Sequence, residues 1–148
     1  MRARDLAAPF PVVRPDTSVL DAARLLAGQD LPGLVVVDER QRPVTILPGT
    51  DVLRMAVPRY CQLDPALARV VDEGAADIFL EQLGDATVEH ALPDRHRELP
   101  VVDEDATALE IAALMARSRS PLVAVVRADG TMLGAVTLDA LLDRVLGS

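Results

Sequence analysis

The sequence predicts an α/β fold made of two similar halves that are related by an approximate twofold axis. Two observations lead to this prediction. The chain of 148 residues contains an internal repeat. In each half, the apolar residues follow the pattern of a strand, then of a helix, then of two strands and a second helix. Each half is therefore predicted as strand-helix-strand-strand-helix, and we expect the sheets of the two halves to pack together.

The repeat is visible by direct alignment. A shift of 89 residues, which places Pro100 on Pro11, lays the second half on the first without a gap from residue 11 onward. Identical residues recur along the whole register: Val12, Val13, Asp16, Leu20, Ala23, Leu25, Ala27, Pro32, Val36, Val37 and Leu53 match Val101, Val102, Asp105, Leu109, Ala112, Leu114, Ala116, Pro121, Val125, Val126 and Leu142. So many identities in one register indicate the duplication of one unit.

Each half opens with a short strand, predicted at residues 10–13 and 99–102. A helix follows, because apolar residues recur at i, i+3, i+4 and i+7 and so share one helix face: Val19, Ala22, Ala23 and Leu26 in the first half, and Ala108, Ile111, Ala112 and Met115 in the second. The candidate N-caps are Asp16, Thr17 or Ser18 for the first of these helices and Asp105 or Thr107 for the second.

A predicted hairpin and a second helix complete each half. In the first half the strands at 34–37 and 44–47 are joined by the turn "DERQR". In the second half the strands at 123–126 and 132–136 flank Asp129-Gly130, which favours a tighter turn. Helices are predicted at 51–57 and 138–146. The strands are almost continuously apolar, as in sheets covered on both faces, and a half of this size is marginally stable alone.

The predicted organisation is a first repeat at residues 1–59, a helical linker at 60–86 and a second repeat at 87–148. In the linker, Asp64 and Pro65 are typical of a helix start. Apolar spacing extends this helix to about Leu83, before Gly84, and Gly74 is a possible kink. We expect the apolar side of the linker helix to lie on the body of the protein or on another subunit.

Composition excludes several classes of function. The net charge of −8 argues against a general role in nucleic-acid binding, which requires a basic surface. The single cysteine, Cys61, permits neither an internal disulfide nor a cysteine metal site. No apolar run is long enough to insert into a membrane, and the charged N-terminus is unlike a signal peptide, so a cytoplasmic location is expected. All 15 basic residues are Arg, which GC-rich coding explains, although Arg also suits an anionic ligand.

With this repeat, the chain resembles a tandem pair of cystathionine-β-synthase (CBS) domains, the two-repeat unit called a Bateman module. The resemblance depends on "VVRPDTSVLDAARLL", on the strand "LVVVD" and on a terminal motif. In the family this motif reads roughly Gly-hydrophobic-hydrophobic-Thr-x-x-Asp. The corresponding segments are "TILPGTD" in the first half and "GAVTLDA" in the second.

The resemblance implies a regulatory module and no catalysis. Such modules pair as disc-like homodimers and bind AMP, ADP, ATP, S-adenosylmethionine or cyclic dinucleotides in clefts between repeats, as effectors that act without a required cofactor. The occupied module then controls a partner protein such as a transporter or an enzyme. The alternative is an interaction module whose nucleotide clefts have decayed and which acts without ligand.

Several positions correspond to the family's ligand contacts. Asp51, beside Thr50, stands where the family's Asp binds the ribose hydroxyls, but Pro48 and Thr45 replace the Thr and Gly of the motif, which favours a plain helix-start Asp. In the second half Gly134 and Thr137 match. Ala140 occupies the ribose position, and Asp139 lies one residue earlier. Thr137 suits either a phosphate contact or an N-cap.

The remaining candidates would contact the base and the phosphates. The opening strands, with Phe10, Val12, Leu99 and Val101, border the adenine in this family, although these apolar side chains also suit a core. Arg54, Arg59, Arg95 and Arg97 are candidates for phosphate. Two of them lie in the inserted run "DRHRE", which a solvated surface loop would also explain. His90 and His96 lack the spacing of metal ligands, and no catalytic motif is present.

Overall fold

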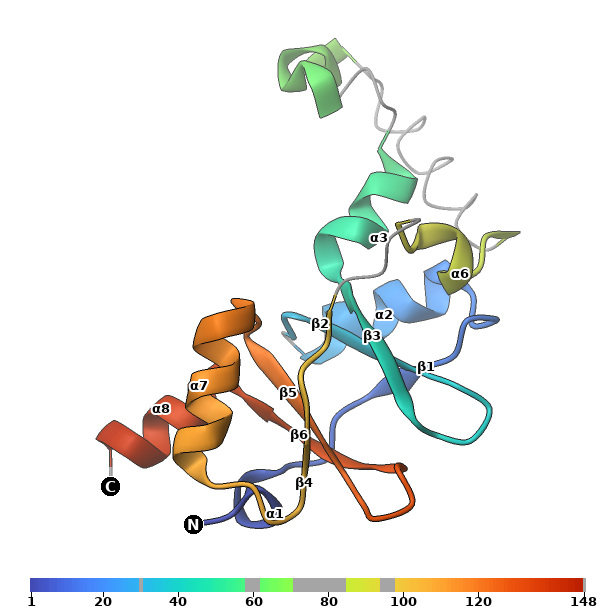
Figure 1. Ribbon diagram of the computed structural model, residues 1–148. Coiled ribbons are helices and arrows are strands. Elements are labelled where there is room, and N and C mark those ends of the chain that lie inside the picture. The colour runs from blue at the N-terminus through green and yellow to red at the C-terminus, as the bar shows by residue number, and fades with distance from the viewer. Residues whose placement is uncertain (30, 58–61, 71–84, 94–97, 148) are drawn as a thin grey trace. The chain divides into compact units, whose positions relative to one another are not determined.

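The computed structural model describes residues 1–148 except 30, 58–61, 71–84, 94–97 and 148 (Figure 1). It confirms the mixed α/β class and the repeated element order. The first half contains β1 (Val12–Val13), α2 (Val19–Gln29), β2 (Gly33–Val37), β3 (Pro43–Pro48) and α3 (Gly49–Ala56). The second half contains β4 (Val101–Asp103), α7 (Ala108–Ser118), β5 (Leu122–Val126), β6 (Met132–Thr137) and α8 (Leu138–Leu146).

The strands form two three-stranded sheets, in the order β1-β2-β3 and β4-β5-β6. β4 runs parallel to β5, with Val102 opposite Val125, and β5 runs antiparallel to β6, with Ala124 opposite Ala135. The parallel pairing follows from the crossover helix α7 between these strands. All five residues of β2 and the first four of β5 are buried, which explains their continuous apolar sequences.

Of the candidate N-caps, Ser18 caps α2 and Thr107 caps α7. The Ser18 hydroxyl accepts a hydrogen bond from the Asp21 backbone N–H at 3.1 Å, and Thr107 accepts one from Glu110 N–H at 3.1 Å. Helix α3 begins after Pro48 without a side-chain cap. A proline suits this boundary because its φ is fixed and it cannot donate a hydrogen bond.

The two hairpin turns have the same geometry, so the expectation of a tighter turn at Asp129-Gly130 is wrong. The outer bond is Asp38 N–H to Arg42 O (2.9 Å) in the first turn and Arg127 N–H to Thr131 O (2.8 Å) in the second. Both turns place their fourth residue in the left-handed region, where Gln41 has φ 62° and Gly130 has φ 88°. The turn geometry is therefore kept while the residue at the strained position differs.

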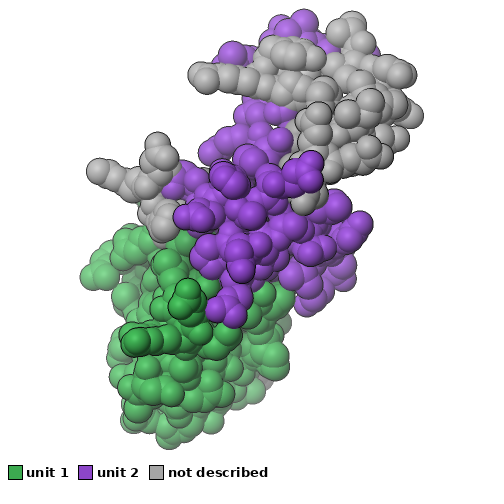
Figure 2. Space-filling view, turned by 90° about the vertical axis from the view of Figure 1, so that its right-hand side faces the viewer, with its two compact units in different colours: residues 1–12, 35–46, 97–148 green, residues 13–34, 47–96 purple. Residues whose placement is uncertain are grey.

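Two compact units are present, shown in different colours in Figure 2. Unit 1 contains residues 1–12, 35–46 and 97–148, and unit 2 contains residues 13–34 and 47–96. The predicted boundaries at 59 and 87 remain a prediction about the repeated sequence. In unit 1, one apolar cluster joins residues of both sheets, which confirms that the sheets pack together: Val35, Val37, Ile46, Leu99, Leu122, Ala124 and Ala135.

Two short helices were not predicted. In unit 1, α1 (Ala3–Leu6) buries Ala3 and Leu6, and Ala3 N–H donates to the carbonyl of Ala106 at 2.8 Å. In unit 2, α6 (Val88–Ala91) is attached by Val88 N–H to Thr17 O at 2.8 Å. Each helix precedes one half of the sequence and packs beside the start of the main helix of the other half.

The middle segment is described only in part. The Asp64 carboxylate accepts from Ala66 N–H at 3.1 Å, as expected for a helix start, but the described helix is a 3₁₀-helix at Pro65–Val70. The rest of the predicted linker helix, including Gly74, Leu83 and Gly84, lies outside the described residues, as does Cys61. Among the residues that the structure describes, no helix is long and apolar enough to cross a membrane.

Candidate functional site

Asp51 is fixed in the first turn of α3. The chain passes directly from β3 into this helix, and the Asp51 side chain is fully buried, with 0% exposure. Its Oδ1 lies 3.4 Å from Nη2 of Arg54, one turn later, whose side chain is 56% exposed. A buried carboxylate requires such partners, and the N-terminal end of a helix also favours negative charge. The carboxylate predicted to bind ribose is therefore enclosed and paired in this conformation.

The start of α8 is arranged differently. The Thr137 hydroxyl oxygen accepts a hydrogen bond from Ala140 N–H at 3.1 Å, which confirms Thr137 as an N-cap. This bond uses an acceptor lone pair and does not use the hydroxyl proton. Asp139 is exposed and Ala140 is half-buried. The first turn of α8 thus has an exposed acid where that of α3 has a buried one.

The opening strands alternate between core and surface. Leu99 belongs to the buried cluster of unit 1, and Phe10 packs against that cluster, so both have the core role that the sequence left open. Val12 and Val101 lie two residues further along their strands and are 37% and 43% exposed. These two valines therefore expose apolar surface, whereas Leu99 does not.

The predicted phosphate contacts are placed only in part. Arg54 pairs with Asp51, and Thr50 lies exposed beside it on α3. Arg59, Arg95 and Arg97 lie outside the described residues. Within the described part of the chain, no group of three or more His, Cys, Asp and Glu side chains is arranged to hold a metal ion.

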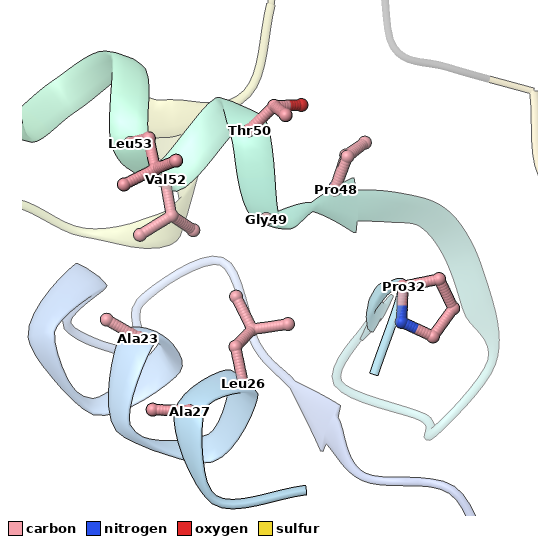
Figure 3. A pocket seen from close by; sticks show the side chains of 9 residues that line it. All are labelled: Ala23, Leu26, Ala27, Pro32, Pro48, Gly49, Thr50, Val52 and Leu53. Carbon is pink, nitrogen blue, oxygen red and sulfur yellow. The ribbon is translucent and has the colours of Figure 1, made fainter. Parts of the chain in front are cut away.

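Reasoning from the sequence missed two apolar grooves, each lying between the two main helices of one half. The groove between α2 and α3 has a volume of about 490 Å³ and is lined by Ala23, Leu26, Ala27, Pro32, Pro48, Gly49, Thr50, Val52 and Leu53 (Figure 3). The groove between α7 and α8 has a volume of about 630 Å³ and is lined by Ala112, Met115, Ala116, Arg119, Ser120, Pro121, Leu138, Leu141 and Leu142. Most of the lining positions correspond under the 89-residue shift.

The first groove is shaped by small residues (Figure 3). Leu26 reaches from α2 toward Gly49, where an added Cβ would lie 3.9 Å from Leu26 Cδ1. Thr50 points away from α2. Leu53, at the edge of this groove, is 59% exposed, and its counterpart Leu142 is 43% exposed. The four-residue spacing of Leu138 and Leu142 in the sequence indicates the apolar surface that α8 contributes to the second groove.

Comparison with known proteins places the chain among CBS domains. The family model described as "CBS domain" matches residues 3–57 and 94–147. A CBS domain-containing protein of unknown function from Kribbella flavida has a solved structure that is 48% identical, with a TM-score of 0.90, and the match covers 99% of both chains.

A curated relative is similar over most of this chain. It is the CBS domain-containing protein CBSX2, chloroplastic, of Arabidopsis thaliana, 33% identical over 129 residues. The match covers 85% of this chain and 54% of CBSX2, so this chain spans about half the length of that relative. The solved structure of CBSX2 in complex with AMP matches with a TM-score of 0.68 and 23% identity, over 99% of this chain and 96% of that one.

Proposed function

This chain belongs to the CBS domain family, and on that basis we propose that it is a regulatory, non-catalytic module that binds an adenine nucleotide and signals its occupancy to a partner protein. The observation that carries the proposal is the likeness to CBSX2, a relative whose structure was solved with AMP. The position of Asp51 in the first turn of α3 supports it. The partner reads the occupied state through a shift between conformations of the module.

The proposed ligand contacts follow from the chemistry of the placed residues. A carboxylate accepts two hydrogen bonds from the cis-diol of a ribose, and Asp51 supplies it in the first half. Because Asp51 is enclosed, binding requires a local opening around the first turn of α3, while Arg54 holds Oδ1 in place. In the second half, the proposed contacts of the nucleotide are the Thr137 hydroxyl, which donates its proton to the phosphate, and the Asp139 carboxylate, which accepts from the sugar hydroxyls. Arg95 is retained as a proposed phosphate contact.

Isothermal titration calorimetry with AMP, ATP, S-adenosylmethionine and cyclic di-AMP tests this proposal. We expect at least one ligand to bind, and Asp51→Asn to weaken its binding by about tenfold or more because a charged acceptor is lost. The matched control is Asp21→Asn, which changes the first-turn acid of α2, an exposed residue paired with Arg24 at 3.6 Å. The absence of a binding heat for all four ligands at millimolar concentration would contradict nucleotide binding.

A ligand-free interaction module is the second candidate function. It is favoured by the enclosure of Asp51 and by the use of Thr137 as a helix cap. Affinity capture of partners with nucleotide-free protein separates the two functions. Capture that does not change when AMP is added supports the interaction module, and capture that depends on AMP supports the nucleotide sensor.

We also propose that the chain acts as a homodimer. The observation is the exposure of leucines on helices of both units, Leu53 on α3 and Leu142 on α8. Light scattering coupled to gel filtration should give twice the monomer mass of 15.8 kDa. A monomer at every concentration tested would refute the pairing and leave nucleotide binding to be judged by calorimetry.

A further inference from the structure

Each unit contains a short helix that is attached, by the same pair of backbone hydrogen bonds, to the segment before a main helix. Two successive N–H groups of the short helix donate to two carbonyls of that segment: Ala3 to Ala106 (2.8 Å) and Arg4 to Glu104 (3.1 Å) in unit 1, and Val88 to Thr17 (2.8 Å) and Glu89 to Pro15 (3.0 Å) in unit 2. The accepting residues correspond under the 89-residue shift, so one attachment is built twice.

A side chain closes the first turn of each short helix, and it differs between the two units. In α1, Asp5 Oδ2 accepts from Arg2 N–H at 3.0 Å. In α6, His90 takes this place, because its Nδ1 accepts from Thr87 N–H at 3.3 Å and lies 2.9 Å from Thr87 Oγ1. The same position of the same attachment therefore carries a carboxylate in unit 1 and an imidazole in unit 2.

These two acceptors respond to pH in different ranges. An imidazole nitrogen accepts a hydrogen bond only while it is unprotonated, and both nitrogens of the charged ring are donors. A protonated His90 can donate to Thr87 Oγ1, but it cannot accept from Thr87 N–H. Histidine side chains generally take up a proton between about pH 8 and 5, whereas carboxylates do so near pH 4. Mild acid therefore removes the imidazole acceptor and leaves the carboxylate acceptor in place.

Several charged residues lie on the elements around His90. Helix α6 packs against α2 and α3 (Figure 1). The charged residues of these helices and of the segments joined to α2 and α6 are Arg14, Asp16, Asp21, Arg24, Asp51, Arg54, Asp85 and Glu89. On α2, Asp21 pairs with Arg24 at 3.6 Å, and on α3, Asp51 pairs with Arg54 at 3.4 Å. Asp, Glu and Arg side chains generally keep their charges over the range in which imidazole titrates, so the change on acidification falls on the His90 bond.

We propose that His90 makes the attachment of α6 sensitive to pH near neutrality, whereas Asp5 keeps the attachment of α1 insensitive over the same range. The neutral ring makes the bond, so its contribution to stability is complete at high pH and is lost as the pH falls. Helix α6 buries Val88 (0% exposed) and Ala91 (8% exposed). Release of α6 in mild acid therefore uncovers apolar surface within unit 2.

Nuclear magnetic resonance of the intact chain tests this proposal. At about pH 7.5, His90 should be the Nε2–H tautomer, because Nδ1 must be free to accept. Between about pH 7.5 and 5.5, the protection of the Val88 N–H against hydrogen exchange should fall by about fivefold, the change expected for the loss of one hydrogen bond. Ala3 N–H, its counterpart in the attachment of α1, should keep its protection.

Two variants assign the response to one histidine, since the chain has only His90 and His96. His90→Asp gives α6 the acceptor that α1 has, and it should keep the same protection of Val88 N–H at both pH values. His96→Gln is the matched control and should respond to pH as the wild type does. Circular dichroism at about pH 7.5 shows whether both variants are folded.

Two results for the wild type would each overturn the proposal: an Nδ1–H tautomer of His90 near neutral pH, or equal protection of Val88 N–H at the two pH values. Both measurements decide the question even where a variant fails to fold. A pH response that persists in His90→Asp and disappears in His96→Gln would also overturn it, because the response would then belong to His96.

Discussion

At the scale of single residues, the two hairpin turns show how a duplicated unit tolerates different residues at one strained position. Gln41 adopts φ 62° where the second half has Gly130 at φ 88°. A residue with a Cβ is strained in the left-handed region, and glycine is not. The first turn compensates through Asp38, whose Oδ1 accepts from the N–H groups of Arg40 (2.8 Å) and Arg42 (3.0 Å).

Substitutions at this pair of positions should have opposite effects on stability. Gln41→Gly removes the strain and should raise the free energy of unfolding by about 0.5–1 kcal/mol. Gly130→Ala introduces the strain and should lower it by about 1 kcal/mol or more. Urea unfolding of both variants measures the difference. Equal effects of the same sign would show that the turns do not share their geometry in solution.

The turn acids also make stability depend on pH. The Thr131 hydroxyl, followed by the Thr131 backbone N–H, lowers the pKa of Asp129 below its ordinary value, and the Arg42 backbone N–H does the same for Asp38. A carboxyl group whose pKa is lower in the folded state stabilises the fold above its unfolded pKa of about 4 and loses this contribution as the pH falls through the folded pKa.

Asp129→Asn should therefore be less stable than the wild type at neutral pH and approach it as the pH falls below about 4. The Asn side chain keeps an oxygen acceptor for Thr131 but carries no charge. Thermal unfolding across this pH range measures the gap. A gap that is constant down to pH 2 would mean that the Asp129 charge contributes nothing.

At the scale of elements, the sequence predicted every strand and main helix of the described repeats, because the apolar spacing of one half confirmed that of the other. The exact strand ends were not predicted: the first strand was expected at residues 10–13, whereas β1 contains only Val12–Val13. Helices α1 and α6 were missed because four residues give no periodic signal and such helices depend on tertiary contacts. The turn at Gly130 was wrongly predicted because its sequence also suits a shorter loop.

Gly134, the glycine of the terminal motif in the second half, lies in β6 and has a packing role that the sequence alone does not reveal. The N-terminal segment pairs with β6 through two hydrogen bonds of 3.0 Å between Ala8 and Ala135. A Cβ on Gly134 would lie 2.7 Å from the carbonyl oxygen of Ala8, closer than real contacts allow. Glycine is required here because backbone approaches backbone.

Gly134→Ala should lower the free energy of unfolding by about 1–3 kcal/mol, because the N-terminal segment must move away from β6. The matched control is Gly28→Ala in α2, where an added Cβ has no atom within 4 Å and helix propensity predicts a gain of about 0.5–1 kcal/mol. Chemical unfolding compares the two. A neutral Gly134→Ala would show that this close approach is absent in solution.

At the scale of the whole molecule, the predicted family is confirmed, while the candidate nucleotide-binding residues remain a prediction. The terminal motif correctly marked the starts of α3 and α8, because each motif spans the junction between a strand and a helix. The burial of Asp51 and the capping role of Thr137 depend on packing and local geometry that the motif does not specify. The two units interleave segments of both sequence halves, which a linear repeat cannot reveal.

Thermal unfolding with and without AMP tests the central claim, nucleotide binding by this chain, most directly. A ligand that binds only the folded state, present at about 100 times its dissociation constant, stabilises a protein by about 2.7 kcal/mol. For a chain of this size, the melting temperature should then rise by about 5–10 °C. We predict this rise for the wild type and at most about half of it for Asp51→Asn at the same ligand concentration. An unchanged melting temperature of the wild type at millimolar AMP, ATP, S-adenosylmethionine and cyclic di-AMP would contradict the claim.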